Sequence, residues 1–342
     1  MYKRQVLGGA PAMRAAGQDD AFVEFMQWAD AVRDIDIRAN ADTPADAEMA
    51  RSFMCDGIGL CRTEHMFFEE DRLTLMREMI FAETTDDRRA VLERLLPLQR
   101  ADFVRLIQIM DGRPVCIRLF DPPLHEFLPT EKGGQRELAE ALNLPLSEVT
   151  RRIEEMREYN PMLGLRGVRL GVTVPEIYEM QARAIFEAAI EANSNGTIAV
   201  PEIMIPLVSA RREVELVAVN IESVAAAVRT ERNCELSYKL GVMVETPRAA
   251  LRAGEIAKHC EFLSFGTNDL TQMTYGLSRD DAGRFMSGYV QQGVFAEDPF
   301  HSLDVDAVGE LLELGSARGR QENPNLTLSI CGEHGGLSLI HI

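Results

Sequence analysis

Lysine and long apolar runs are nearly absent from this sequence of 342 residues. The only lysines stand at positions 3, 132, 239 and 258, and 54 acidic side chains against 36 basic ones give a formal net charge of −18. So acidic a chain lacks the clustered cations that bind nucleic-acid phosphates or an acidic membrane surface. Its positive charge is nearly all arginine, whose planar fork suits carboxylate and phosphate groups.

The sequence also lacks membrane, secretion and zinc signals. No window approaches the ~20 apolar residues that a membrane helix needs, and no apolar run typical of a secretion signal follows residues 1–5. The six cysteines include no CxxC pair and have no histidine partners at zinc spacing. These absences predict a cytoplasmic protein with free thiols.

The sequence does contain a repeated alternation of short apolar runs and long helical patterns. Strands are predicted at residues 37–40, 57–61, 115–119, 203–207, 241–244, 262–265 and 326–330. Helices are predicted at residues 22–32, 44–53, 73–80, 88–110, 177–192, 211–229, 248–258 and 305–314. Near-continuous apolar strands between helices are typical of an α/β fold with a parallel sheet. Residues 160–170 are rich in proline and glycine, so we expect a loop there rather than an eighth strand.

Polar residues follow the predicted strands at their carboxyl ends, where a (β/α)8 TIM barrel places its chemistry. They are Arg62, Arg118, Glu245, Asn268, Asp269 and Cys331, with Arg166 in the glycine-rich loop. Each residue alone is weak evidence for a functional site, because an arginine is more often part of a surface ion pair than a ligand contact and a cysteine is often a small buried hydrophobe. His65, His125 and His334 also follow strands and could touch a ligand, whereas His259 and His301 are expected to be ordinary surface residues.

The combination of these residues is more informative than any one of them. Three arginines suit a ligand that carries both a carboxylate and a phosphate. Glu245 and Asp269 match the one or two carboxylates that Mg²⁺ takes from a protein. The backbone of residues 266–269 offers N–H groups to a small anion. A thiol of ordinary pKa at Cys331 is suited to moving a proton at carbon.

Five stretches of the sequence resemble the carboxy-terminal domain of the pyruvate, phosphate dikinase family of phosphoenolpyruvate (PEP)-utilising enzymes. They are GLCRTEHMFF at 59–68, RLFDPPLHEF at 118–127, NPMLGLRG at 160–167, FGTNDLTQM at 265–273 and CGEHGG at 331–336. The resemblance runs from about Val6 to Gly336 and keeps the five motifs in order.

This resemblance implies a (β/α)8 barrel that interconverts pyruvate and PEP with Mg²⁺ as cofactor. It assigns phosphoryl and carboxylate binding to Arg62, Arg118 and Arg166, and Mg²⁺ binding to Glu245 and Asp269. It assigns substrate contacts to Gly266, Thr267 and Asn268, and proton donation to Cys331. The family's full-length enzymes also carry phosphohistidine and ATP-grasp domains and are usually homodimers. Neither of those domains is recognised in this sequence, so the ATP half-reaction is not expected of it.

Two alternatives stay open at this point. PEP synthase and enzyme I of the sugar phosphotransferase system share the Arg-Thr-Glu, Gly-Thr-Asn-Asp and Cys-Gly-Glu elements, although the sequences around His125 and His334 look more like the dikinase. An inactive barrel is the other alternative, against which the intact polar residues argue.

The resemblance also sets the expected domain boundaries. Residues 1–5 are expected to be a non-native leader, 6–36 a linker and helix, 37–336 the barrel with an insertion at about 121–151, and 337–342 a non-native tail. The barrel would then stop before its last strand and helix, which leaves an open edge. We therefore expect the chain to be poorly stable or to aggregate.

Overall fold

The computed structural model describes residues 20–337. The chain divides between Ile37 and Arg38 into two compact units. The first contains helix α1 (Asp20–Val32), which was predicted at 22–32. The predicted leader, and the predicted tail beyond Leu337, lie outside the described residues. No helix within the described residues is long and apolar enough to cross a membrane.

The second unit is built on a parallel sheet whose seven strands follow one another in chain order. The strands are β1 (Arg38–Asn40), β2 (Gly57–Arg62), β3 (Val115–Arg118), β4 (Pro201–Ile205), β5 (Lys239–Val244), β6 (Phe262–Gly266) and β7 (Thr327–Cys331). All seven strand predictions are confirmed. The stretch 160–170 forms no strand, as expected, but contains the 3-10 turn η3 (Pro161–Leu163) and the start of helix α7 (Val168–Thr173).

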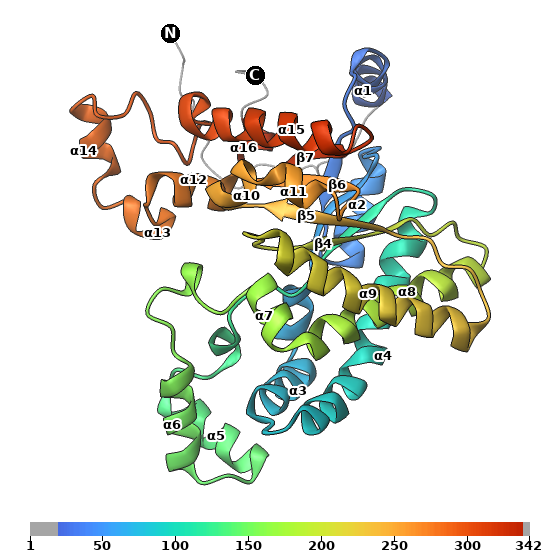
Figure 1. The fold of residues 1–342 in the computed structure, drawn as a ribbon, viewed down its shortest axis with the longest axis vertical. Coiled ribbons are helices and arrows are strands. Elements are labelled where there is room, and N and C mark those ends of the chain that lie inside the picture. The colour runs from blue at the N-terminus through green and yellow to red at the C-terminus, as the bar shows by residue number, and fades with distance from the viewer. Residues whose placement is uncertain (1–19, 338–342) are drawn as a thin grey trace, which may run out of the picture. The chain divides into compact units, whose positions relative to one another are not determined.

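Helices follow the strands and cover the sheet (Figure 1). The predicted helices correspond to α2 (Pro44–Ser52), α3 (Glu70–Phe81), α4 (Thr85–Met110), α8 (Pro175–Ser194), α9 (Arg211–Arg232) and α15 (Glu310–Glu322), the last preceded by the π turn η4 (Val305–Gly309). Thr43 caps α2 by accepting from the backbone of Asp46, whose carboxylate accepts in turn from the backbone of Thr43. α4, α8 and α9 pack side by side in chain order.

The structure corrects two helix predictions. The helix expected at 248–258 is two short helices, α10 (Pro247–Leu251) and α11 (Ala253–Ala257), that meet at Arg252. Residues 267–291 hold three short helices that were not predicted, α12 (Thr267–Tyr275), α13 (Arg279–Ala282) and α14 (Met286–Gln291). The segment expected to be an insertion with short helices does contain the turn η2 (Leu124–Phe127) and helices α5 (Lys132–Leu142) and α6 (Leu146–Met156).

The sheet is curled. The Arg38 guanidinium in β1 lies 2.6 Å from the buried carboxylate of Glu202 in β4, although two strands separate them in the sheet order. Within residues 20–337, β1 and β7 do not pair with each other, so the sheet is open along that line. Closure into a complete (β/α)8 barrel therefore stays a prediction.

The inner face of the curled sheet carries a separate apolar layer. Its buried side chains are Leu60, Cys116, Met204, Met243 and Phe262, one from each of five neighbouring strands. The residues next to them along the strands, such as Ile117 and Leu263, belong to the main core beneath the helices. The pairing of β2 with β3 has a register shift between Ile58 and Cys61. Because of this shift, Ile58 and Cys61 both pack outward, whereas Leu60 packs inward.

Candidate functional site at the carboxyl ends of the strands

The site follows from the period of two along the strands. Successive strand side chains point to opposite faces, so the residue two positions beyond each member of the apolar layer lies on the same inner face. Counting two residues on from Leu60, Cys116, Met243 and Phe262 gives Arg62, Arg118, Glu245 and Ser264. Cys331, at the end of β7, pairs with Gly266 and packs against the same layer. Most of the predicted site residues are thus brought to one edge by strand geometry.

Arg118 is the most enclosed of the three predicted arginines, with about 10% of its side chain exposed. Its guanidinium bonds Glu64 and lies 3.2 Å from the carboxylate of Asp121. Burial would lower the pKa of Arg118, but the neighbouring carboxylates, Glu64 first, raise it on balance. Among the described residues, Nε of Arg118 and Oε2 of Glu64 are buried without a hydrogen-bond partner. A ligand with acceptor atoms would satisfy the Nε donor.

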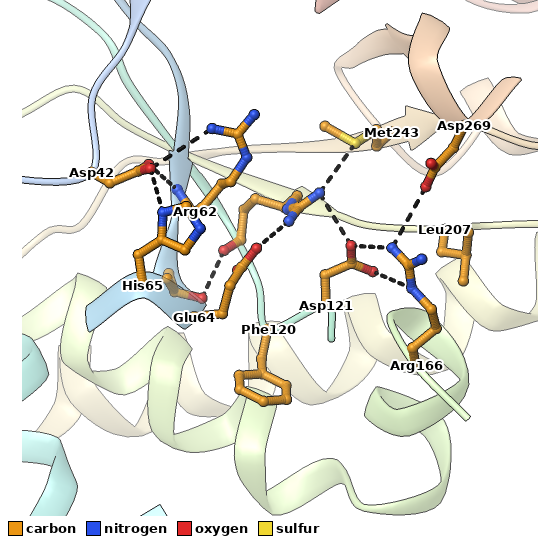
Figure 2. A network of polar contacts seen from close by, with 12 residues as sticks. Asp42, Arg62, Glu64, His65, Phe120, Asp121, Arg166, Leu207, Met243 and Asp269 are labelled. Atoms are coloured by element: carbon orange, nitrogen blue, oxygen red, sulfur yellow. Dashed lines mark hydrogen bonds and ion pairs between the residues drawn. The ribbon is translucent and has the colours of Figure 1, made fainter. Parts of the chain in front are cut away.

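Arg166 reaches the same carboxylate from the glycine-rich loop. It bonds Asp121, and its Nη2 lies 3.5 Å from Oδ2 of Asp269, so Figure 2 shows it between the two acids. Asp121 therefore joins two of the three predicted arginines. Burial would raise the pKa of Asp121, but Arg118 and Arg166 lower it on balance. Asp121 is ionised and holds both guanidinium groups in place.

Gly167 makes this approach of the loop to the sheet feasible. Its φ of +55° is in the left-handed region, and its N–H donates to the carbonyl of Asp121 across 2.8 Å. A Cβ at this position would lie 2.7 Å from Cβ of Leu207 and 2.9 Å from Oδ1 of Asp121. Any larger residue would push the loop and Arg166 away from the site.

Glu245 and Asp269 form the acidic part of the site. Glu245 is 4% exposed, and one of its oxygens accepts from the backbone N–H of Leu207 across 2.9 Å. Burial, followed by the charges of Asp121 and Asp269, raises the pKa of Glu245 to about 8. Asp269 is oriented by Gln272, whose amide donates to Oδ1 across 2.9 Å. Glu245 therefore tends to take up a proton where no cation lies beside it.

Glu245 and Asp269 are a pair of carboxylates rather than a closed metal cage. No group of three or more His, Cys, Asp or Glu side chains suited to a metal occurs within the described part of the chain. Mg²⁺ commonly takes one or two protein carboxylates and completes its octahedron with ligand oxygens and water. The pKa of Glu245 is raised first by burial and then by repulsion from Asp121 and Asp269, and a bound cation would offset that repulsion.

Cys331 lies at the end of β7 with its sulfur facing Ser264. The Ser264 hydroxyl donates to Sγ across 3.3 Å, and Sγ lies 3.5 Å from the carbonyl oxygen of Phe265. Burial raises the pKa of the thiol to about 11, although the Ser264 hydrogen bond acts in the lowering direction. The thiol is therefore protonated at neutral pH. Its pKa is higher than the ordinary thiol pKa expected from the sequence. A protonated thiol is the form that donates a proton.

Gly266, Thr267 and Asn268 join β6 to α12 and lock that turn against β7. A Cβ on Gly266 would lie 2.6 Å from Cγ of Glu245, so the glycine leaves room for the carboxylate. The Thr267 hydroxyl donates to the carbonyl of Cys331 across 3.3 Å, and Oδ1 of Asn268 accepts from the backbone N–H of Glu333 across 3.1 Å. These side chains hold Cys331 beside the amino end of α12.

Arg62 lies at the outer part of the site, with about 32% of its side chain exposed. Its backbone N–H donates to Oδ1 of Asp42 across 2.6 Å, and Nη1 lies 3.7 Å from Oδ2 of the same residue. Figure 2 shows Asp42, Arg62 and His65 grouped together, apart from Arg166 and Asp269. Of the other loop histidines, His334 is buried, with one ring nitrogen 2.9 Å from the Thr267 hydroxyl and the other 3.0 Å from the Pro299 carbonyl, so it serves packing.

Four residues of this network were missed from the sequence. They are Asp42, Glu64, Asp121 and Ser264, which touch Arg62, Arg118, Arg166 and Cys331. Ser264 could have been found by counting two positions along the strand. The acids carry no such signal, because the chain contains 54 of them.

A hollow lies away from this site. It encloses about 630 Å³ near the amino ends of β5 and β6, and Tyr238, Cys260 and Asn323 are among the residues that line it. The Tyr238 hydroxyl donates to Glu222 and the Asn323 amide donates to the Cys260 carbonyl. Two of its other polar residues, Lys258 and His259, pair with Glu322 and Glu215, which do not line it.

Comparison with known proteins identifies the family of this chain. The family model described as "PEP-utilising enzyme, PEP-binding domain" matches residues 16–341. A pyruvate, phosphate dikinase of Rhizobium meliloti is 54% identical over 97% of this chain and 37% of its own length. A pyruvate, phosphate dikinase of Clostridium symbiosum is 48% identical over 94% of this chain and 37% of its own length.

A chloroplastic pyruvate, phosphate dikinase of Arabidopsis thaliana is 51% identical over 97% of this chain. The chain spans 35% of the length of that relative and little more of the other two. A match over nearly the whole chain, to a family model and to full-length relatives at about half identity, leaves one assignment. The chain belongs to the PEP-binding domain family of the PEP-utilising enzymes.

Proposed function

We propose that this chain carries the site at which pyruvate and PEP interconvert in a pyruvate, phosphate dikinase. The observation that carries the proposal is the convergence of Arg118, Arg166, Glu245 and Cys331 on one edge of the sheet. A cationic cluster beside two carboxylates and a protonated thiol suits a small dianionic oxyacid that gains or loses a proton at carbon.

The curled sheet is proposed to be part of a (β/α)8 TIM barrel. The sequential parallel order of the strands and the contact between Arg38 and Glu202 across the inner face support that architecture. So does the position of the polar groups, because barrel enzymes gather their chemistry at the carboxyl ends of the strands.

The proposed roles follow from the position of each group. Arg62, Arg118 and Arg166 bind the phosphoryl and carboxylate groups, and the backbone N–H groups of residues 266–268 face an anion at the start of α12. Glu245 and Asp269 hold Mg²⁺, which when bound supplies positive charge beside the enolate and phosphoryl oxygens. The Cys331 thiol gives its proton to the methylene carbon of the enolate, and in the reverse direction the Cys331 thiolate takes a proton from the methyl group of pyruvate.

The remaining chemistry is proposed to lie elsewhere in the full-length enzyme. The chain spans about a third of the length of the dikinases that it matches, and the resemblance places the phosphohistidine and ATP-grasp domains in the rest of such an enzyme. Arg62, at the exposed rim, is where a phosphohistidine from another domain would meet the phosphoryl group. The relatives reported above are named dikinases, which favours this function over the PEP synthase and enzyme I alternatives.

The test is Mg²⁺-dependent exchange of the methyl protons of pyruvate with deuterated water, followed by proton NMR. This exchange needs only the proposed pyruvate half-site. We expect exchange in the chain, and loss of exchange with retained pyruvate binding in Cys331→Ala. Cys116→Ala is the matched control, because it removes a buried thiol from the apolar layer beneath the site. Bound pyruvate without exchange in the unaltered chain would reject the proposal.

A further inference from the structure

Asp42 connects two groups at the rim of the site that come from different elements. It follows β1 by two residues, whereas Arg62 ends β2 and His65 lies in the 3-10 turn η1 (Thr63–Phe68). Oδ1 of Asp42 accepts from the backbone N–H of Arg62 across 2.6 Å, and Oδ2 lies 2.8 Å from Nδ1 of His65. In Figure 2 the carboxylate stands next to both side chains. One carboxylate thus orients both an arginine and a histidine.

The fold itself does not need this histidine. About 52% of the His65 side chain is exposed, whereas Thr63, Glu64, Met66 and Phe67 of the same turn are buried. The turn is held by those residues, and an ion pair or hydrogen bond at an exposed histidine adds little to stability. Asp42 is better buried, with 15% of its side chain exposed, so the carboxylate is the fixed partner and the ring is the group presented outward.

The orientation of the ring decides which atom is presented. The bond from Nδ1 to a carboxylate fixes that side of the ring, and in the imidazolium form Nε2 carries a proton as well. Nε2 then points away from Asp42. No described residue forms a hydrogen bond or ion pair with Nε2 of His65. A donor of this kind, on a ring that shares the Asp42 carboxylate with the Arg62 guanidinium, matches the oxygens of a phosphoryl group.

Exposure indicates which end of the ligand lies here. Arg62 and His65 have 32% and 52% of their side chains exposed, whereas Arg118 has 10%. The group that must be passed to another domain has to lie at the accessible rim, and the group that is only held can lie deeper. The phosphoryl group therefore belongs with Arg62 and His65.

We propose that Nε2 of His65 donates a hydrogen bond to the phosphoryl group of PEP, and that Asp42 positions His65 and Arg62 together for this contact. This inference rests on the proposed function and adds to it a residue that distinguishes PEP from pyruvate. His65 binds the phosphoryl group without forming a covalent bond to it, and Asp42 is a positioning residue that does not itself touch the ligand.

The experiment compares His65→Asn with His65→Gln. The asparagine amide can take the place of Nδ1 and keep the bond to Asp42 but leaves nothing at Nε2, whereas the longer glutamine amide reaches the position of Nε2. The dissociation constants of PEP and of pyruvate are measured by calorimetry with Mg²⁺ present. Loss of one hydrogen bond to a charged oxygen corresponds to about tenfold to hundredfold weaker binding. We expect the preference for PEP over pyruvate to fall by that factor in His65→Asn and by much less in His65→Gln.

The control is His259→Asn, since His259 also pairs with a carboxylate, that of Glu215 at 3.3 Å, but follows α11 away from the strand ends. It should leave both dissociation constants unchanged. Equal weakening of PEP and pyruvate in His65→Asn would mean that His65 only holds the turn, and unchanged binding of both would mean that it makes no contact; either result overturns the inference. If the unaltered chain binds PEP yet exchanges no pyruvate protons, the proposed function fails while the phosphoryl contact still stands or falls on His65→Asn.

Discussion

The hydroxyl of Ser264 donates a hydrogen bond to the thiol of Cys331 across 3.3 Å, from the neighbouring strand. Such a donor favours the thiolate over the thiol, and so counteracts part of the increase in pKa that burial causes. The pair therefore sets how readily Cys331 can take a proton from carbon.

Ser264→Ala should slow the exchange of pyruvate methyl protons. Without the hydroxyl, the pKa of Cys331 rises further above about 11, and the thiolate fraction at a given pH falls. Each unit by which the pKa of Cys331 rises lowers the thiolate fraction at pH 8 about tenfold, and the exchange slows with it. The measurement is the exchange rate by NMR as a function of pH, with Ser329→Ala in β7 as control. An unchanged pH profile in Ser264→Ala would show that the hydroxyl does not tune the thiol.

Binding of Mg²⁺ should release a proton from Glu245. The pKa of Glu245 is raised to about 8, so the carboxyl is mostly protonated at pH 7, and a cation binds its ionised form. We expect the affinity for Mg²⁺ to increase as the pH rises from 6 to 9, with close to one proton released per ion at pH 7. Calorimetry in buffers of different ionisation enthalpy counts that proton. Glu245→Gln should abolish both the release and most of the binding, and release from that variant would assign the proton elsewhere.

The same carboxyl group should make the metal-free chain less stable in alkali. Its folded-state pKa of about 8 lies above the value of 4.5 for an exposed glutamate, so the folded state binds the proton more tightly. The stabilisation from that proton is present below pH 4.5 and is lost as the pH rises to about 8. Glu245→Gln should flatten the decline in melting temperature by about 2 °C or more. Melting curves from pH 5 to 9 that fall equally in both proteins would contradict the raised pKa.

Gly167→Ala should damage both stability and binding. The added Cβ would meet Leu207 and Asp121, and alanine is strained at a φ of +55°. We expect a loss of about 1–3 kcal/mol in the free energy of unfolding, with weaker binding of pyruvate and PEP because Arg166 moves. Gly196→Ala is a matched control, because Gly196 also has a positive φ, +87°, but a Cβ there would have no atom within 4 Å. Equal effects of the two changes would show that crowding at Gly167 is unimportant.

Arg38→Met should destabilise the sheet without altering the ligand site. Glu202 is 4% exposed and, among residues 20–337, would keep only Lys239, at 3.8 Å, as a charged partner. Leaving a buried charge poorly paired costs about 3–5 kcal/mol where the pair is fully enclosed, and less here because Arg38 is partly exposed. Urea denaturation measures the loss. The double variant with Glu202→Met should recover part of it; failure to do so would argue against the ion pair as the cause.

All seven strands were found within a few residues, and the fully buried strands β3, β4 and β6 were marked in the sequence by continuous apolar runs. The helices α12, α13 and α14, which lie between β6 and β7 in the chain, were missed because such short helices have little apolar periodicity. The site residues at strand ends were predicted because strand order brings their carboxyl ends together. Their roles still stand as proposals.

What the sequence could not supply was the effect of burial and of partners. Cys331 was expected to have an ordinary thiol pKa, but enclosure raises that pKa to about 11. Asp121 looked like one acid among many, and only the folded chain shows it between Arg118 and Arg166. Both differences arise from contacts between residues far apart in the chain, which a local pattern does not encode.

The apolar layer formed by Leu60, Cys116, Met204, Met243 and Phe262 has a consequence for how the protein can change over time. It separates the ion pair of Arg38 and Glu202 from the polar groups at the carboxyl ends of the strands. Substitutions among the polar groups at the carboxyl ends of the strands can alter ligand preference while the ion pair on the other side of the layer keeps the sheet curled. A new ligand specificity can therefore evolve at the carboxyl ends of the strands without changes at the ion pair of Arg38 and Glu202.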